Sequence, residues 1–318
     1  MVRYIIRRIL YLIPVLICVS FLIYALMDLT PGTVADNYIP NDATEEERAE
    51  IYARFDLDKP MIYRYGKYMF NFVQGDLGRS AVTNEKIFEV YMKRFPATFL
   101  LGLASIFIAG VVAVPLGILA ARHAGSVIDN GITVFTLIGM ALPNFLIGLV
   151  FLFAFSLKLK WFPAGSDGSL KSFILPAVCN GLSQMAGTAR QTRSAMLDVL
   201  RSDFLRTARA KGVSEKKVIW KHALGNAMIP ILTTLGGHLC SVMAGSVVIE
   251  SIFAWPGVGR LTTDAIQARD TQLACGAVIL STILYVVMQL LVDLMYAAVD
   301  PRIKASFIRS AKRRRKAA

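Results

Sequence analysis

Six stretches of this sequence are apolar and long enough to cross a lipid bilayer as helices. They cover residues 9–28, 98–121, 132–157, 173–192, 227–249 and 273–297. A helix needs about 20 residues to cross the hydrocarbon core. Within that core every backbone polar group needs a partner inside the protein, which a helix supplies. The sequence therefore predicts an all-α fold, a polytopic membrane helix bundle with six transmembrane helices.

The fourth stretch is more polar than the others. It contains Asn180, Ser183, Gln184, Thr188 and Arg190. A helix that is surrounded by protein or lines a wet pathway carries such residues more easily than one that faces lipid. We therefore take Asn180 and Gln184 as candidates for the lining of a pathway.

Four further residues in or beside these stretches carry expectations. Pro143 is expected to kink the third helix, and Asp293 is expected to have an interhelical partner. His238 is expected to be hydrogen-bonded inside the bundle rather than to act as a ligand. Glu250 is a third pathway candidate, as a gate or interface residue, and the alternative is a solvated carboxylate at a helix end.

Basic residues are concentrated in three polar segments. The N-terminus carries three arginines, residues 190–221 carry nine basic and three acidic residues, and residues 301–318 carry eight basic residues and no acidic one. By the positive-inside rule these segments, and hence both termini, lie in the cytoplasm. The basic tail is explained more simply by orientation and contact with anionic lipid than by nucleic-acid binding.

Arginines before the first stretch also occur in secretory signals. The apolar region here is long, however, and LMDLTPGTV after it has no convincing small-x-small cleavage site. An uncleaved first span is therefore favoured.

About seventy residues separate the first two stretches, which is too long for a simple connection. NDATEEERAEIYARFDLDKP suggests a capped helix that begins near Thr44, followed by a turn at Pro60. The aromatic residues of MIYRYGKYMFNFVQGDLGRS are consistent with an amphipathic helix along the protein or the membrane surface. We expect an external segment that helps to dock a binding protein.

The polar segment DFLRTARAKGVSEKKVIWKHALGNAMIP predicts two short helices joined by a sharp turn. Asp203 can cap a helix over residues 204–211, and Gly212 can end that helix with a positive φ. Ser214 can cap a second helix that begins at Glu215.

The first of these short helices has an apolar face that a partner can use. That face carries Phe204, Leu205 and Ala208, while basic residues lie elsewhere on the surface. From these residues alone an ordinary cytoplasmic loop and a DNA-binding helix-turn-helix remain open alternatives.

At this segment the chain resembles the membrane-spanning permease subunits of bacterial ABC importers. Their cytoplasmic signature loop reads Glu-Ala-Ala, three residues, Gly. Ala208 and Gly212 fit it, Arg206 and Thr207 replace the Glu and the first Ala, and Gly225 stands where the broader family often has Pro. RTARAKG followed by HAL and IP is most similar to the dipeptide, oligopeptide and nickel permeases.

In that family the loop forms a coupling helix that fits a cleft in the ATPase subunit. The resemblance assigns ATPase coupling to residues within a loop of about 193–226, namely Phe204, Leu205, Arg206, Thr207, Ala208, Arg209, Ala210, Lys211, Gly212, Val213, Ser214 and Glu215.

Other motifs carry the same resemblance over most of the chain. DKP and GDLGRS in the external segment are similar to the B-type subunit of the peptide and nickel permeases. Family-like motifs recur as ALPNFLIGL (141–149), VVIESIFAWPGVGRL (247–261) and LVDLMYAAVDPRIK (291–304). The implied fold is the type I ABC importer permease fold.

The resemblance implies that the chain forms half of the translocation pathway for peptides, nickel or related small solutes in a bacterial inner membrane. The implied partners are a homologous C-type permease subunit, two ATPase subunits that bind ATP and Mg, and an extracytoplasmic substrate-binding protein. The implied domains are residues 1–97 (first span and external segment), 98–300 (permease core) and 301–318 (tail).

Motifs for catalysis are missing from the sequence. It has no G-x-x-x-x-G-K-[ST] phosphate loop, no H-E-x-x-H and no G-x-S-x-G. We expect no enzyme activity and no catalytic, cofactor or metal site in this chain. An ATP-independent secondary transporter or channel is the alternative, although no clear inverted repeat with two broken helices is visible.

Overall fold

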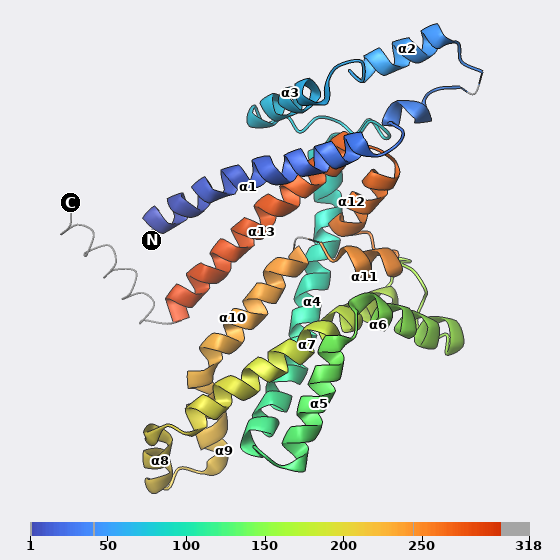
Figure 1. The fold of residues 1–318 in the computed structure, drawn as a ribbon. Coiled ribbons are helices and arrows are strands. Elements are labelled where there is room, and N and C mark those ends of the chain that lie inside the picture. Colours follow the sequence, from blue (N-terminus) through green and yellow to red (C-terminus); the bar gives the residue numbers. More distant parts are fainter. Residues whose placement is uncertain (1, 41, 244, 300–318) are drawn as a thin grey trace, which may run out of the picture.

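The computed structural model describes residues 2–40, 42–243 and 245–299, so the predicted tail domain lies outside the described residues. Within these ranges the regular structure is helical, apart from one isolated β-bridge between Arg79 and Lys86 (Figure 1). The predicted all-α class is confirmed.

Along the chain the structure has a series of α-helices, one short 3-10 helix (η1) and two short π-helices (η2 and η3). They are α1 (Val2–Leu29), η1 (Val34–Asn37), α2 (Glu45–Arg54), α3 (Met61–Val73), α4 (Ile87–Arg122), α5 (Val127–Ala141), α6 (Asn144–Phe151), η2 (Leu152–Lys158), α7 (Leu170–Leu200), α8 (Asp203–Ala210), α9 (Glu215–Lys217), η3 (Val218–Ala223), α10 (Leu224–Met243), α11 (Val247–Ile252), α12 (Val258–Gln267) and α13 (Thr271–Val299).

Three helical segments of the described chain are long and apolar enough to cross a membrane. They are Leu10–Leu29, Ile87–Arg122 and Thr271–Met295. A bent pair, Val127–Ala141 with Asn144–Lys158, adds a fourth if it counts as one span. The predicted spans 173–192 and 227–249 fall in α7 and α10, which are helical but do not meet this criterion. Length and composition thus support three or four of the six predicted spans.

Pro143 breaks the third predicted span. Proline lacks the N–H that an uninterrupted helix requires, and it pushes the preceding residue into extended backbone. Accordingly Leu142 has φ −77° and ψ 125°, and α5 ends before it. The axes of the two halves differ by 95°. The expected kink is therefore a complete break.

The most extensive contact between two helices in the described chain is that between α4 and α7. The small buried residues Ala109, Ala113 and Gly117 of α4 let the two backbones approach closely. A Cβ atom added at Gly117 would lie 2.6 Å from the carbonyl oxygen of Ala189. Any larger residue at Gly117 would therefore push α7 away from α4.

The first and last helices lie side by side, as Figure 1 shows. Arg8 of α1 forms an ion pair with Asp293 of α13. The expected interhelical partner of Asp293 is thus confirmed, and it lies on the helix that is farthest away in sequence.

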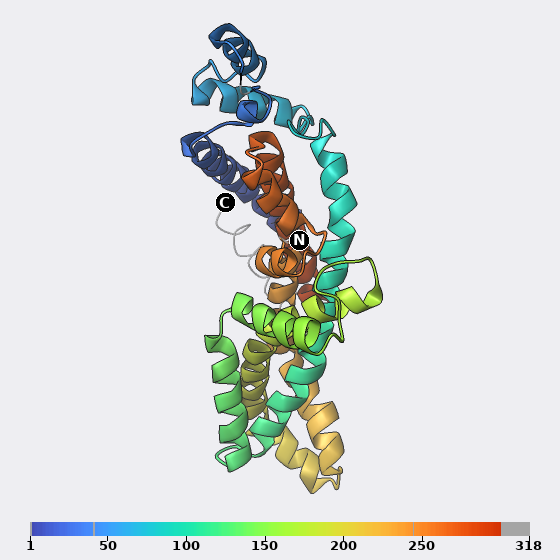
Figure 2. The same cartoon turned by 90° about the vertical axis from the view of Figure 1, so that its right-hand side faces the viewer.

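The external segment and the polar turn lie at opposite ends of the molecule. In Figure 2 the blue helices α2 and α3 lie beyond one end of α4, and the yellow α8 and α9 lie near its other end. The helix near Thr44 is confirmed, because Thr44 and Glu47 form a capping box at the start of α2. α3 begins directly after Pro60 and packs on α1 through Tyr65.

Candidate functional site

Gly212 makes the sharp turn that the sequence predicts between α8 and α9. Its φ is +77°, a region that glycine enters without steric cost. The N–H of Gly212 donates to the carbonyl of Arg209 at 2.9 Å, and the N–H of Val213 donates to the carbonyl of Ala208 at 3.2 Å. These two bonds form a Schellman motif, which ends α8 and fixes the direction of the chain after it.

α8 begins and ends one residue earlier than predicted, whereas α9 begins at Glu215 as predicted. Ser202 is the N-cap of α8, Asp203 is its first residue, and the helix ends at Ala210. Asp203 is therefore not a capping residue. Ser214 does precede a helix that begins at Glu215, but its side chain makes no capping hydrogen bond.

The apolar face of α8 is divided between the protein interior and solvent. Leu205 is fully buried in a cluster with Met196, Val218 and Ile219, and Ala208 packs against that cluster. Phe204, by contrast, is 44% exposed. The expectation of a shared face for a partner is corrected: Leu205 and Ala208 attach α8 to its own bundle, and Phe204 is the apolar side chain left outside.

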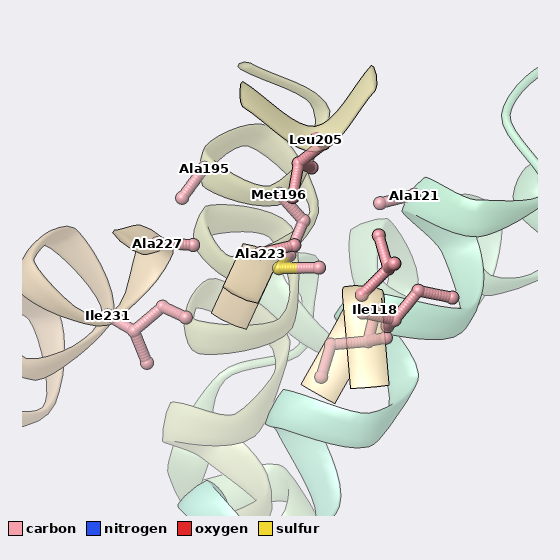
Figure 3. Close-up of a cluster of buried hydrophobic side chains, with 10 residues drawn as sticks. Ile118, Ala121, Ala195, Met196, Leu205, Ala223, Ala227 and Ile231 are labelled. Carbon is pink, nitrogen blue, oxygen red and sulfur yellow. The ribbon is translucent and has the colours of Figure 1, made fainter. Parts of the chain in front are cut away.

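The cluster around Leu205 connects α8 to the long helices. Its buried members come from α4, α7, η3 and α10, as the close-up in Figure 3 shows. The labelled members are Ile118, Ala121, Ala195, Met196, Leu205, Ala223, Ala227 and Ile231. Because interiors of this kind are close-packed, α8 could not be displaced without straining its contacts with these helices.

A charged pair spans the Gly212 turn. The Arg209 guanidinium donates to both oxygens of the Glu215 carboxylate, at 2.9 and 3.0 Å. These hydrogen bonds hold the pKa of Glu215 below its ordinary value. The remaining residues assigned to coupling on this surface are exposed or partly exposed: Arg206, Thr207, Ala210, Lys211, Val213 and Ser214.

A polar cavity of about 430 Å³ lies where α6, α7, α10 and the start of α11 meet. Two of the predicted pathway residues, Asn180 and Gln184, line it from α7. Asn144, at the start of α6, accepts a hydrogen bond from Ser183 and completes this wall. The other lining residues are His238, Ser241, Val242, Gly245, Ser246, Val247, Val248 and Ile249.

His238 lines this cavity, and the hydrogen bond expected for it in the bundle is not found at its Nε2 atom in the described chain. Its Nε2 atom is buried and has no hydrogen-bond partner among the described residues. The sequence held a signal for this position, because His238 lies among Thr233, Thr234 and Ser241 in an otherwise apolar helix.

Glu250 lies outside the cavity lining, in a hydrogen-bond network of its own. Its side chain is fully buried and accepts hydrogen bonds from Thr98 Oγ1 at 2.8 Å and from the N–H of Arg260 at 2.9 Å. The N–H of Ser246 also donates to it at 3.3 Å. The solvated alternative is wrong, and the structure does not bring Glu250 together with Asn180 and Gln184.

Position 257, which lies against the Glu250 carboxylate, requires a glycine. A Cβ atom added at Gly257 would lie 2.4 Å from the Glu250 carboxylate. The carboxylate therefore joins α4, α11 and the start of α12, and the glycine makes room for it.

Asp129 and Arg193 form a second polar contact that sequence reasoning missed. The Asp129 side chain is almost completely buried at the start of α5. It also accepts a hydrogen bond from the N–H of Gly125 at 2.9 Å. The contact holds the start of α5 against α7.

Comparison with known proteins matches nearly the whole chain. Residues 113–305 match the family described as binding-protein-dependent transport system inner membrane component. Residues 1–102 match the corresponding N-terminal family.

Curated relatives match this chain over nearly its whole length and over nearly their own whole length. An oligopeptide transport system permease protein of Bacillus subtilis, AppB, is 40% identical over 96% of this chain and 100% of its own. A di/tripeptide transport system permease protein of Pseudomonas aeruginosa, DppB, is 36% identical over 96% of this chain and 99% of its own. A glutathione transport system permease protein of Escherichia coli, GsiC, is 35% identical over the same shares of the two chains.

A solved structure shares the fold. One chain of an inward-facing form of the MetNI methionine ABC transporter superposes with a TM-score of 0.58. It covers 66% of this chain and 96% of its own length at 16% identity. At that identity the match concerns the fold alone.

Proposed function

Because the chain belongs to the family of binding-protein-dependent transport system inner membrane components, we propose that it forms half of the translocation pathway of an ATP-driven peptide importer. The chain is the permease component of such a system and is not an enzyme. Relatives named for oligopeptides, di/tripeptides and glutathione support peptides as the substrate class. The polar cavity between α6, α7, α10 and the start of α11 is the observation that supports a pathway in this chain.

Six spans are the number that the fold supports best. At 1.5 Å per residue the 31-residue α7 is about 46 Å long and the 20-residue α10 about 30 Å, so both reach across the hydrocarbon core. Their polar residues are compatible with a bilayer because they face a cavity and other helices. Together with α1, α4, the α5–η2 pair and α13, these helices make six.

The orientation follows from the basic segments and from the two ends of the molecule. With the N-terminal arginines in the cytoplasm, α1 carries the chain outward, and α2 and α3 are external. α4 then returns the chain inward, which places α8 and α9 on the cytoplasmic side, at the opposite end in Figure 2. Six spans return the C-terminal tail to the cytoplasm.

Impermeant thiol labelling tests this orientation. In a background without Cys18, Cys179, Cys240 and Cys275, a cysteine at Glu46 or Asn84 reacts from outside. A cysteine at Glu215 or Ser310 reacts only after permeabilisation; Ser310 lies outside the described residues. Labelling in the opposite order would overturn the orientation.

The proposed partners are a homologous C-type permease subunit, two ATPase subunits and an extracytoplasmic binding protein. ATP and Mg belong to the ATPase subunits in this proposal. The exposed side chain of Phe204, beside the basic surface of α8, is the proposed contact with an ATPase. Closure of the ATPases moves α8, and the Leu205 cluster transmits that motion to α4, α7 and α10.

Co-expression and reconstitution test the function. The chain with its three kinds of partner in proteoliposomes is expected to take up dipeptide only with ATP inside and binding protein outside. Dipeptide flux through this chain alone, without ATP, would instead support the secondary transporter or channel. The same preparation with an ATPase subunit that cannot hydrolyse ATP is the matched control.

A further inference from the structure

Three residues that line the cavity between α6, α7 and α10 each carry a buried polar side-chain atom. The Asn180 amide nitrogen, the Gln184 amide oxygen and the His238 Nε2 atom each lack a hydrogen-bond partner within the described residues. Only 4% of Asn180 is exposed. Buried polar groups are normally paired, so three unpaired groups around one space indicate a site that receives partners from outside the chain.

The break at Pro143 adds the start of a helix to the same space. α6 begins at Asn144, which lines the cavity, and no side chain caps it. The N-terminal end of a helix carries partial positive charge and exposes N–H groups, which suits an oxygen acceptor. Asn144, at this end of α6, and Asn180, on α7, line the same cavity.

Among the described residues, those that line the cavity include no Asp, Glu, Lys or Arg. A solute carboxylate or ammonium group would therefore find no opposite full charge there, and burying such a charge unpaired is costly. A lipid chain would leave the polar atoms unpaired. In the main chain of a peptide, the uncharged group that offers one donor and one acceptor together is the peptide unit.

We propose that this cavity is a transient binding site for a main-chain peptide unit of the transported solute, held by Asn180, Gln184 and His238. The proposal rests on the proposed function and adds the part of the substrate that this chain recognises. The cavity's volume of about 430 Å³ falls within the range of small-molecule sites. Recognition of the main chain ignores side chains, which leaves selection among peptides to the binding protein.

A methylated substrate tests the proposal. The assembled transporter in proteoliposomes is given tetra-alanine, whose central peptide unit lies away from the charged ends, or its analogue with all peptide bonds N-methylated. Each peptide is supplied with enough binding protein saturated by that peptide. The wild type is expected to take up tetra-alanine about fivefold to tenfold faster, because the analogue has no main-chain amide donor for Gln184. Asn180→Leu and Gln184→Met are expected to lower tetra-alanine uptake to the level of the analogue.

Controls separate this site from assembly. Both variants are expected to keep subunit association and basal ATP hydrolysis, and Thr282→Val on α13, away from the cavity, is expected to keep wild-type uptake of both peptides. If Asn180→Leu does not assemble, Gln184→Met decides, because Gln184 is only partly buried and Met preserves its length.

Unchanged uptake in Gln184→Met, or a wild type that transports both peptides equally, would overturn the proposed site and leave the importer function intact. A wild-type complex without ATP-dependent uptake of either peptide would overturn the proposed function itself.

Discussion

Arg193 donates hydrogen bonds to both oxygens of the Asp129 carboxylate, at 2.5 and 2.7 Å. Asp129 lies at the start of α5, and Arg193 lies two turns before the end of α7. The chain passes from α7 directly into α8. This pair therefore connects the helix that leads to the Pro143 break with the helix that leads to the Gly212 turn.

We expect removal of this pair to weaken coupling. Arg193→Gln leaves the buried Asp129 carboxylate with fewer donors, and a charged hydrogen bond of this kind contributes about 1.5–3 kcal/mol. Peptide uptake is expected to fall while ATPase subunits still associate, since α8 and its cluster are unchanged. Uptake per ATP hydrolysed in proteoliposomes measures this.

A double-mutant cycle shows whether the two residues act together. Asp129→Asn combined with Arg193→Gln is expected to cost little more than either change alone. Lys171→Gln, an exposed basic residue at the other end of α7, is the control and is expected to behave as wild type. Additive losses in the double variant would show that the two residues act independently.

Glu250 is expected to be a stability residue. Its buried carboxylate accepts from Thr98, Ser246 and Arg260, so Glu250→Ala leaves three donors unpaired and is expected to destabilise the bundle by about 2–4 kcal/mol. Thr98→Val removes one donor to Glu250 and leaves the N–H of Val258 without its acceptor, and it is expected to cost less than the loss of all three contacts of Glu250. Thermal unfolding in detergent measures both, and a Glu250→Ala protein with unchanged unfolding but altered transport would restore its role as a gate.

Features that depend on local backbone chemistry were predictable from the sequence. The turn at Gly212, the break at Pro143 and the capping box at Thr44 each follow from the conformational limits of one or two residues. Even so, the start of α8 shifts by one residue, because Ser202 and Asp203 are both good capping residues and the pattern does not distinguish them.

Features that depend on contacts between distant helices were not predictable. From the sequence, Leu205 belongs to an apolar face open to a partner; in the structure it packs against α4 and α10. Glu250 reads as a helix-end carboxylate until Thr98, 152 residues away, donates to it. The pairing of Arg193 with Asp129 likewise requires knowing that α5 folds back on α7, which charge alone does not reveal.

Gly212 provides a test of backbone geometry in the turn. A Cβ atom added there meets nothing within 4 Å, so the cost of substitution comes from the φ of +77° alone. Gly212→Val is expected to be strained by about 1–3 kcal/mol and to lose ATPase association and uptake together. Gly212→Asn, which tolerates positive φ, is expected to retain most of both.

Membrane insertion and binding-protein docking are expected to persist in Gly212→Val, because neither uses this turn. Co-purification of the ATPase subunits, ATP hydrolysis and uptake are the measurements. Normal values for all three would refute the coupling assignment, and loss of the protein from the membrane would assign Gly212 to folding.

The external segment is expected to loosen only in acid. The N–H of Thr33 and then the Tyr52 hydroxyl hold the pKa of Asp36 below its ordinary value of 3.8, and Lys59 and Lys67 do the same for Asp56. A carboxyl group whose pKa is lowered by folding stabilises the fold above its unfolded pKa, and that stabilisation is lost as the pH falls through the lower, folded value. The three histidines of the chain, His123, His222 and His238, lie outside this segment, so nothing in it has an ordinary pKa between 5 and 8. Limited proteolysis of residues 33–86 in the purified transporter is expected to be constant from pH 8 to pH 5 and to rise below about pH 4. Asp36→Asn is expected to be cleaved faster than the wild type above about pH 4, and the difference is expected to shrink at lower pH as Asp36 becomes protonated. Cleavage that rises between pH 8 and pH 5 would contradict this account.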